Sequence, residues 1–194
     1  MTASIVILAS GGGRTVENLH RYLSSNTLDA RITKIFSSSP SAGVISRSEN
    51  LGIDAAVVSE DIVDDIRGES PDWILLAGWL RLLPIPPDFE GRVLNIHPSL
   101  LPAWGGKGFW GQHVHDAVAA SGSAQVSGCS VHFASAEYDR GPIILQEATL
   151  LPPMADSATI ATAVFEAEKR AYPEALRLLL TGRVRWKDGS AVWA

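Results

Sequence analysis

The sequence predicts an α/β fold in which one domain, residues 1–194, forms a doubly wound, mostly parallel sheet with helices on both faces. A charge-free apolar run opens the chain, and a glycine loop and an amphipathic segment follow it. Strand-like and helix-like segments then alternate, which is typical of a parallel sheet with crossover helices. The length suits one α/β domain or at most two small ones, and because no repeat, low-complexity stretch or charge block marks a linker, one continuous domain is the simplest interpretation.

The first part of the chain reads as two strand and helix pairs. Ser4–Ala9 is rich in β-branched residues and free of charges, as expected of a strand buried on both faces, and Thr15–Ser25 has the pattern of a helix. Arg31–Ser37 is the second predicted strand. Ala42–Leu51 is the second predicted helix, because Gly52 supplies a stop at its end.

The rest of the chain continues the alternation and then adds hairpins. Strands are predicted at Ala55–Val58, Trp73–Trp79 and Val93–His97, and helices at Gln112–Ala120 and Ser157–Leu180. The segments SGCSVHFAS and PIILQEATLL flank AEYDRG like the two arms of a long hairpin. The closing RVRWKDGSAVWA contains KDGS, which predicts a short hairpin there.

Composition excludes several classes of protein. A net charge of −5 gives no general attraction to nucleic acid, so we expect no nucleic-acid partner. The apolar runs SIVILAS and DWILLAGWL are far shorter than the roughly 20 residues that span a bilayer, and the first lacks the basic flank of a signal peptide. We therefore expect a cytoplasmic protein with no membrane partner. Cys129 is the single cysteine, which excludes an internal disulfide framework and gives no metal-ligand cluster.

The stretch RVLNIHPSLLPAWGG carries two polar side chains at the end of a predicted strand. The period of two places Asn95 and His97 on one face, with Ile96 turned into the core. Pro98 ends the ladder, so the pair should lie at the carboxyl edge of the sheet, where open α/β folds bind ligands. The alternative is a buried polar pair tied to neighbouring backbone.

Asp139 precedes a Gly-Pro turn that can carry its carboxylate back over the sheet edge. Beside His97 and Asn95 it would complete a base, an orienting carboxylate and a carbonyl-polarising amide, the set needed for acyl transfer. The alternative is a local turn in which Asp139 only bonds nearby backbone. His132, in the preceding predicted strand, is either a supporting member of such a site or a structural residue.

The loop ASGGGRTVENL joins the first strand to the first helix and can cradle an anion with its successive amides. It is a poor dinucleotide fingerprint, because Val16 stands where a third glycine would fall. A monophosphate fits better, and Arg14 adds a cation where its charge would lie. The alternative is a tight turn with no ligand.

His113 and His115, two residues apart in GQHVHDAV, have the spacing of zinc ligands at first sight. No carboxylate or cysteine cluster accompanies them, and a helix start explains them as capping or lining residues. We therefore expect no bound metal.

Six motifs together resemble the phosphoribosylglycinamide formyltransferases and their folate-dependent formyltransferase and hydrolase relatives. They are ILASGGG with ENL, SAGVISRSENLGI, AGWLRLLP, NIHPSLLPAWGGKGFWGQHVHDAV, GCSVHFASAEYDRGPIILQ and EKRAYPEAL. The resemblance covers nearly the whole chain. It implies the Rossmann-like formyltransferase fold and the co-substrate 10-formyltetrahydrofolate, without a metal.

The resemblance also implies roles for individual residues. Asn95 and His97 are the catalytic amide and the proton-transfer histidine, and Asp139 is the carboxylate that favours the protonated form of His97. The resemblance also implies a folate pocket, which Asn95 adjoins, and a site for the phosphate of the substrate. The implied folate-binding residues are Leu80, Arg81, Leu82, Leu83 and Asn95, and the implied phosphate-binding residues are Gly12, Gly13, Arg14 and Thr15, with Glu168 nearby.

Two segments depart from the family pattern. Arg14 and Thr15 replace the usual small hydroxyl residue and asparagine, which alters the grip on phosphate. The segment Ser59–Pro71 is much shorter than the helix that the family usually has there, and it offers no certain counterpart of the arginine that contacts folate.

The expected function is transfer of the formyl group of 10-formyltetrahydrofolate to the amine of N1-(5-phosphoribosyl)glycinamide in purine biosynthesis. Hydrolysis of 10-formyltetrahydrofolate and transfer to another phosphorylated amine are the alternatives. Hydrolases of this group usually carry an extra N-terminal regulatory domain, whereas this chain opens at its first strand. The expected partners are the two small-molecule substrates, in a monomer or a homodimer.

Overall fold

The centre of the protein is a seven-stranded sheet with the order β3-β2-β1-β4-β5-β6-β7. The computed structural model describes residues 2–25 and 28–194. Neighbours from β3 to β5 pair in parallel, while β6 and β7 are antiparallel additions, so the predicted doubly wound, mostly parallel sheet is confirmed. The strands are β1 (Ala3–Ala9), β2 (Ala30–Ser37), β3 (Ala55–Val57), β4 (Trp73–Leu76), β5 (Val93–His97), β6 (Val126–Phe133) and β7 (Ile143–Leu150).

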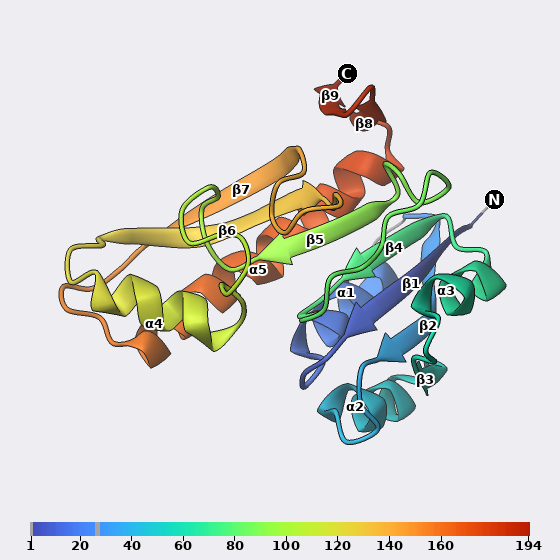
Figure 1. Ribbon diagram of the computed structural model, residues 1–194, viewed down its shortest axis with the longest axis horizontal. Coiled ribbons are helices and arrows are strands. Elements are labelled where there is room, and N and C mark those ends of the chain that lie inside the picture. Colours follow the sequence, from blue (N-terminus) through green and yellow to red (C-terminus); the bar gives the residue numbers. More distant parts are fainter. Residues whose placement is uncertain (1, 26–27) are drawn as a thin grey trace.

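Helices cover both faces of this sheet because strand side chains alternate between two apolar clusters. Ile5 and Ile7 of β1 pack in one cluster with helices α1 and α5, whereas Val6 and Leu8 pack in the other with α3. The long α5 lies along one face of the sheet (Figure 1). The helices are α1 (Arg14–Ser25), α2 (Gly43–Leu51), α3 (Ile62–Glu69), α4 (Gln112–Ala120) and α5 (Ser157–Leu180).

One buried hydroxyl fixes α5 against the middle of the sheet. Tyr172 is fully buried, and its Oη lies 3.1 Å from the carbonyl oxygen of Leu76 and 3.2 Å from that of Leu94. Leu76 is the last residue of β4 and Leu94 is the second residue of β5, so this contact fixes α5 beside the end of β4 and the first half of β5. Within the described residues, no helix is both long enough and apolar enough to cross a membrane.

One expectation needs correction, and one helix has no counterpart among the predicted elements. The fourth strand ends at Leu76 rather than Trp79, because the chain turns at Gly78, whose φ is +72°. The segment of residues 59–71 forms the eight-residue helix α3, which Asp61 caps by accepting two backbone N–H groups at 3.1 Å. The predicted terminal hairpin is present as β8 (Val184–Lys187) and β9 (Ser190–Trp193).

The strand order places a binding site at one edge of the sheet. From β1 the chain builds outward through β2 and β3 on one side, and it then returns to build β4 and β5 on the other. The switch point therefore lies between the carboxyl ends of β1 and β4, the usual position of ligands in open α/β sheets.

Candidate active site

A cavity of about 380 Å³ opens at this switch point. Its walls come from the loop after β1, the segment after β4, the end of β5, the turn after β6 and one side of α5. The volume suits a small-molecule ligand. The structure brings all the predicted site residues to this one cavity: Gly12, Gly13, Arg14, Thr15, Leu80, Arg81, Leu82, Leu83, Asn95, His97, Asp139 and Glu168.

Strand β5 presents Asn95 and His97 to the cavity while Ile96 packs in the core on the opposite face. His97 is only 3% exposed, whereas Asn95 is half-buried. The Nε2 atom of His97 lies 2.8 Å from the carbonyl oxygen of Trp104. Because a carbonyl oxygen only accepts, Nε2 carries a proton, and Nδ1 is the ring nitrogen that faces Asp139.

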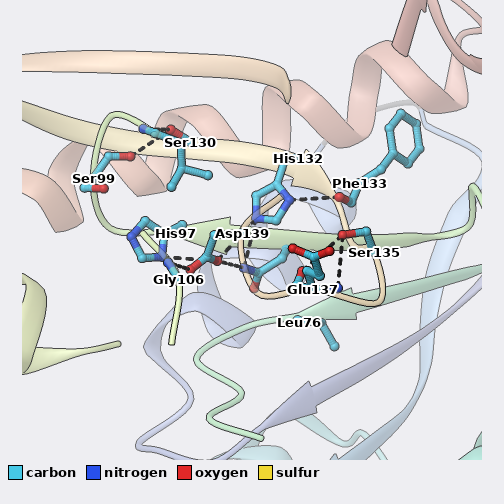
Figure 2. A network of polar contacts seen from close by, with 12 residues as sticks. Leu76, His97, Ser99, Gly106, Ser130, His132, Phe133, Ser135, Glu137 and Asp139 are labelled. Carbon is cyan, nitrogen blue, oxygen red and sulfur yellow. Dashed lines mark hydrogen bonds and ion pairs between the residues drawn. The ribbon is translucent and has the colours of Figure 1, made fainter. Parts of the chain in front are cut away.

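Asp139 lies between two imidazole rings, as Figure 2 shows. Its Oδ1 is 3.4 Å from Nδ1 of His97 and 3.7 Å from Nε2 of His132. The Nδ2 of Asn95 donates to the same oxygen at 3.3 Å, and the N–H of Gly106 donates to Oδ2 at 2.8 Å. The backbone φ of Asp139 is +56°, in the left-handed region that aspartate tolerates better than most residues. The turn thus returns the carboxylate to the sheet edge.

The contacts of Asp139 determine its charge. Burial by itself raises the pKa of Asp139, but the neighbouring imidazoles of His132 and His97, the charge of His97 and the N–H of Gly106 outweigh it. The pKa of this carboxyl is therefore held well below its usual range. Asp139 is ionised at neutral pH and can stabilise a positive charge on a neighbouring ring.

His132 belongs to the same cluster, which the sequence left undecided. Its Nδ1 lies 2.8 Å from the carbonyl oxygen of Phe133 and so carries a proton, while its Nε2 lies 3.1 Å from Nδ2 of Asn95. The pairing of β6 with β5 identifies it, because His132 is the cross-strand partner of Asn95. It orients the amide of Asn95 toward Asp139.

Two polar side chains of the hairpin hold the loop that follows β5. Ser130 Oγ accepts the N–H of Leu101 at 2.9 Å, and Gln146 Nε2 donates to that Oγ at 2.8 Å and to the Leu101 carbonyl at 3.0 Å. These bonds fix the path of the chain toward Trp104. The carbonyl that orients His97 is therefore itself held in place.

The glycine loop after β1 is shaped by close packing. Gly13 has a φ of +74°, and a Cβ atom there would lie 2.8 Å from Cγ2 of Val44 in α2. Arg47 Nε donates to the carbonyl of Gly12 at 2.7 Å and ties the loop to the same helix. Helix α1 begins at Arg14, so the N–H groups of its first turn, which have no partner within the helix, lie at the cavity. This arrangement suits an anion.

Glu168 projects from α5 into the cavity wall. Burial raises the pKa of its carboxyl from 4.5 to about 7, and the positive charges of Arg14 and His97 act in the opposite direction. No ion pair joins Glu168 to Arg14, although both line the cavity. Glu168 therefore changes its charge near neutral pH.

The segment after β4 offers apolar surface. Leu80 and Leu82 are each 46% exposed, while Leu83 is buried at 3%. The guanidinium of Arg81 lies 5.6 Å from the ring centroid of Trp79. Two exposed leucines beside a cavity suit a flat, partly apolar ligand.

The arginine of α3 does not reach the cavity. Arg67 pairs with Asp88 at 2.9 Å and is absent from the cavity lining. The structure therefore offers no counterpart in this segment of the arginine that contacts folate in the family. Other groups of the cavity must hold that part of the ligand.

His113 and His115 do not face a common ligand. Residues two apart on a helix point in different directions, and His113 packs edge-on against Trp110 while His115 is 8% exposed in the cavity wall. Burial lowers the pKa of His115, with the negative charge of Asp116 opposing the shift. In residues 2–25 and 28–194 no three His, Cys, Asp or Glu side chains are grouped as metal ligands.

Glu137, Tyr138 and Phe165 are among the cavity residues for which the sequence predicts no role in the site. The first two belong to the turn that carries Asp139, so the turn itself is their signal. Phe165 lies in α5, where the sequence pattern predicts an aromatic side chain in the core. Nothing in the sequence indicates that it lines the cavity instead.

Comparisons with known proteins agree on one family. The sequence profile of the formyl transferase family matches residues 3–176. The chloroplastic phosphoribosylglycinamide formyltransferase of Vigna unguiculata is 34% identical over 95% of this chain, which spans 64% of that relative's length. The phosphoribosylglycinamide formyltransferase of Escherichia coli is 30% identical, with 97% of this chain and 92% of the relative covered.

A solved structure agrees with the sequence comparisons. The crystal structure of phosphoribosylglycinamide formyltransferase from Brucella melitensis superposes with a TM-score of 0.82 at 34% identity. The superposition covers 94% of this chain and 97% of that one.

Proposed function

Because the chain belongs to the formyl transferase family, we propose that it transfers the formyl group of 10-formyltetrahydrofolate to the amine of N1-(5-phosphoribosyl)glycinamide, a step of purine biosynthesis. One observation carries the proposal. Asn95, His97 and Asp139 meet in a cavity that a phosphate-suited glycine loop and exposed leucines also line. A phosphorylated acceptor and a flat donor can therefore bind on either side of the same polar cluster.

The two substrates use different walls of the cavity. The acceptor phosphate binds the first-turn amides of α1, with Arg14 and Thr15 beside it. The folate ring system packs against Leu80 and Leu82, whose exposure no other described contact explains.

The reaction forms one carbon–nitrogen bond and breaks another. The acceptor amine attacks the formyl carbon, and negative charge develops on the formyl oxygen. The bond from that carbon to the folate nitrogen then breaks. Overall the amine loses a proton and the departing nitrogen gains one. The site must therefore stabilise an oxyanion and move a proton.

Asn95 supplies the neutral donor for the oxyanion. Its Nδ2 directs one N–H toward His132 at 3.1 Å and one toward Asp139 at 3.3 Å. The second contact is the longer and weaker, so the oxyanion can displace it. A donor of this kind contributes on the order of 3 kcal/mol to lowering the barrier.

His97 supplies the positive charge and the proton. Its Nε2–H is held by the carbonyl of Trp104, and its Nδ1 lies 3.4 Å from ionised Asp139, whose negative charge can stabilise a positive charge on the ring. A protonated ring beside the oxyanion lowers its energy, and Nδ1 can pass its proton toward the departing nitrogen through a water molecule.

A spectrophotometric assay with a 10-formylfolate donor tests the proposal. The donor should be consumed only when phosphoribosylglycinamide is present. Consumption at the same rate without any acceptor would identify a hydrolase instead. If the donor is consumed only with a different phosphorylated amine, the protein is still a formyltransferase but its acceptor is that amine.

A further inference from the structure

The guanidinium of Arg14 lies over the aromatic ring of Phe165, which is on another helix. Its guanidinium carbon is 4.1 Å from the ring centroid of Phe165, and both side chains line the cavity. Within the described part of the chain, Arg14 makes neither a hydrogen bond nor an ion pair through its side chain. The ring of Phe165 is therefore the group that defines where this cation lies.

The two helices that carry this pair are joined next to it. Asn18 Nδ2 in α1 donates to the backbone carbonyl of Lys169 in α5 at 2.9 Å. The ammonium of Lys169 also lies near the Phe165 ring, 5.7 Å from its centroid, but it pairs with Glu166 at 2.5 Å. Of the two cations at this ring, Lys169 is already neutralised and Arg14 is not.

A guanidinium that lies over an aromatic ring can still bind other groups. A cation–π contact uses the face of the group, whereas its five N–H donors point outward in the plane. A free Arg14 side chain could instead swing to the carboxylate of Glu168 in the same cavity, where the pair would cancel its charge. The ring of Phe165 opposes this and keeps the donor edge available to an anion.

We propose that Phe165 is a positioning residue that holds the guanidinium of Arg14 beside the glycine loop, with its N–H edge presented to the phosphate of the acceptor. The inference rests on the proposed function for the identity of that acceptor. The phosphate itself is recognised by the loop amides and by Arg14, and Phe165 acts through Arg14 alone.

Binding of ribose 5-phosphate, followed by phosphorus NMR titration, tests the role without any formyl transfer. Phe165→Leu should raise the dissociation constant about three- to tenfold, because the ring contact is lost. Phe165→Tyr keeps the ring and should stay within about twofold of the wild type. Lys169→Met, which removes the other cation at the ring, is the matched control and should have no effect. Circular dichroism of each variant checks folding.

The decisive arm repeats Phe165→Leu in the Arg14→Ala background, where it should have no further effect. An equal loss in both backgrounds would overturn the proposal, since Phe165 would then act on the ligand or the fold directly. Unchanged binding by Phe165→Leu in the wild-type background would also overturn it, whatever the transfer assay shows. If Phe165→Leu weakens binding only when Arg14 is present, and the protein transfers no formyl group, the positioning role is supported and the proposed acceptor is wrong. A wild type that does not bind ribose 5-phosphate would overturn the positioning role, while the transfer assay with phosphoribosylglycinamide would still decide the proposed function.

Discussion

Replacing Glu168 by glutamine should stabilise the protein above neutral pH and leave its stability nearly unchanged in mild acid. In the wild type, burial raises the pKa of the Glu168 carboxyl from 4.5 to about 7, with Arg14 and His97 opposing the shift. The folded protein therefore holds this proton more tightly than the unfolded chain does. The contribution of this group to the free energy of unfolding is fully present below pH 4.5, the unfolded pKa, and it falls as the pH rises to about 7, the folded pKa.

The size of the effect follows from that interval. A displacement from 4.5 to about 7 corresponds to about 3 kcal/mol at the usual conversion. Since Glu168 is partly open to water in the cavity, we expect about 1 to 3 kcal/mol above pH 7. Glutamine has the same shape and no charge, so the Glu168→Gln variant should lose this pH dependence.

Urea denaturation of both proteins between about pH 5 and pH 8 measures the difference, and other titrating groups cancel because both chains share them. The matched control is Glu166→Gln, an exposed change on the same helix, for which the difference from the wild type should not vary with pH. A Glu168→Gln difference that is equal at every pH would refute the reasoning. If the wild type instead became more stable than Glu168→Gln as the pH rises, the predicted direction of the effect would be wrong.

Three further predictions follow from single contacts. Arg14→Ala should raise the KM for phosphoribosylglycinamide about ten- to a hundredfold and leave the KM of the donor unchanged in steady-state kinetics; equal increases in both would contradict a phosphate role. Tyr172→Phe should lower the free energy of unfolding in urea by about 1 to 2 kcal/mol, because two carbonyls lose a buried donor, and an unchanged midpoint would count against that bond. Gln146→Ala should lower kcat about tenfold with little change in either KM, because it frees the loop that orients His97; a normal kcat would show that the loop holds without it.

Much of the fold could be predicted because its signals are local. Buried parallel strands are charge-free runs, and the period of two alone places Asn95 and His97 on the face opposite Ile96. The predicted end of the fourth strand was wrong because the apolar pattern continues to Trp79, whereas the chain turns at Gly78, which has a positive φ. Helix α3 is not among the predicted helices because it spans only eight residues, although Asp61 is a good N-cap.

The site could be predicted as a set of residues but not as a network. Asp139 reaches His97 through a turn whose direction no spacing specifies. His132 enters through the register of β6 against β5, and because α4 separates these strands in the sequence, only their alignment in space sets it. The stacking of Arg14 on Phe165 joins two helices that are far apart in the sequence, so only the packed structure shows it.

The destination of the formyl carbon tests the proposed chemistry most directly. With a 10-formylfolate donor labelled with carbon-13 at the formyl group, carbon NMR should detect the label on the amine of phosphoribosylglycinamide. The rate should fall at least about a hundredfold in a folded His97→Ala variant. Label that appears as formate despite the acceptor, or label that a folded His97→Ala protein transfers at the wild-type rate, would contradict transfer by the cluster of Asn95, His97 and Asp139.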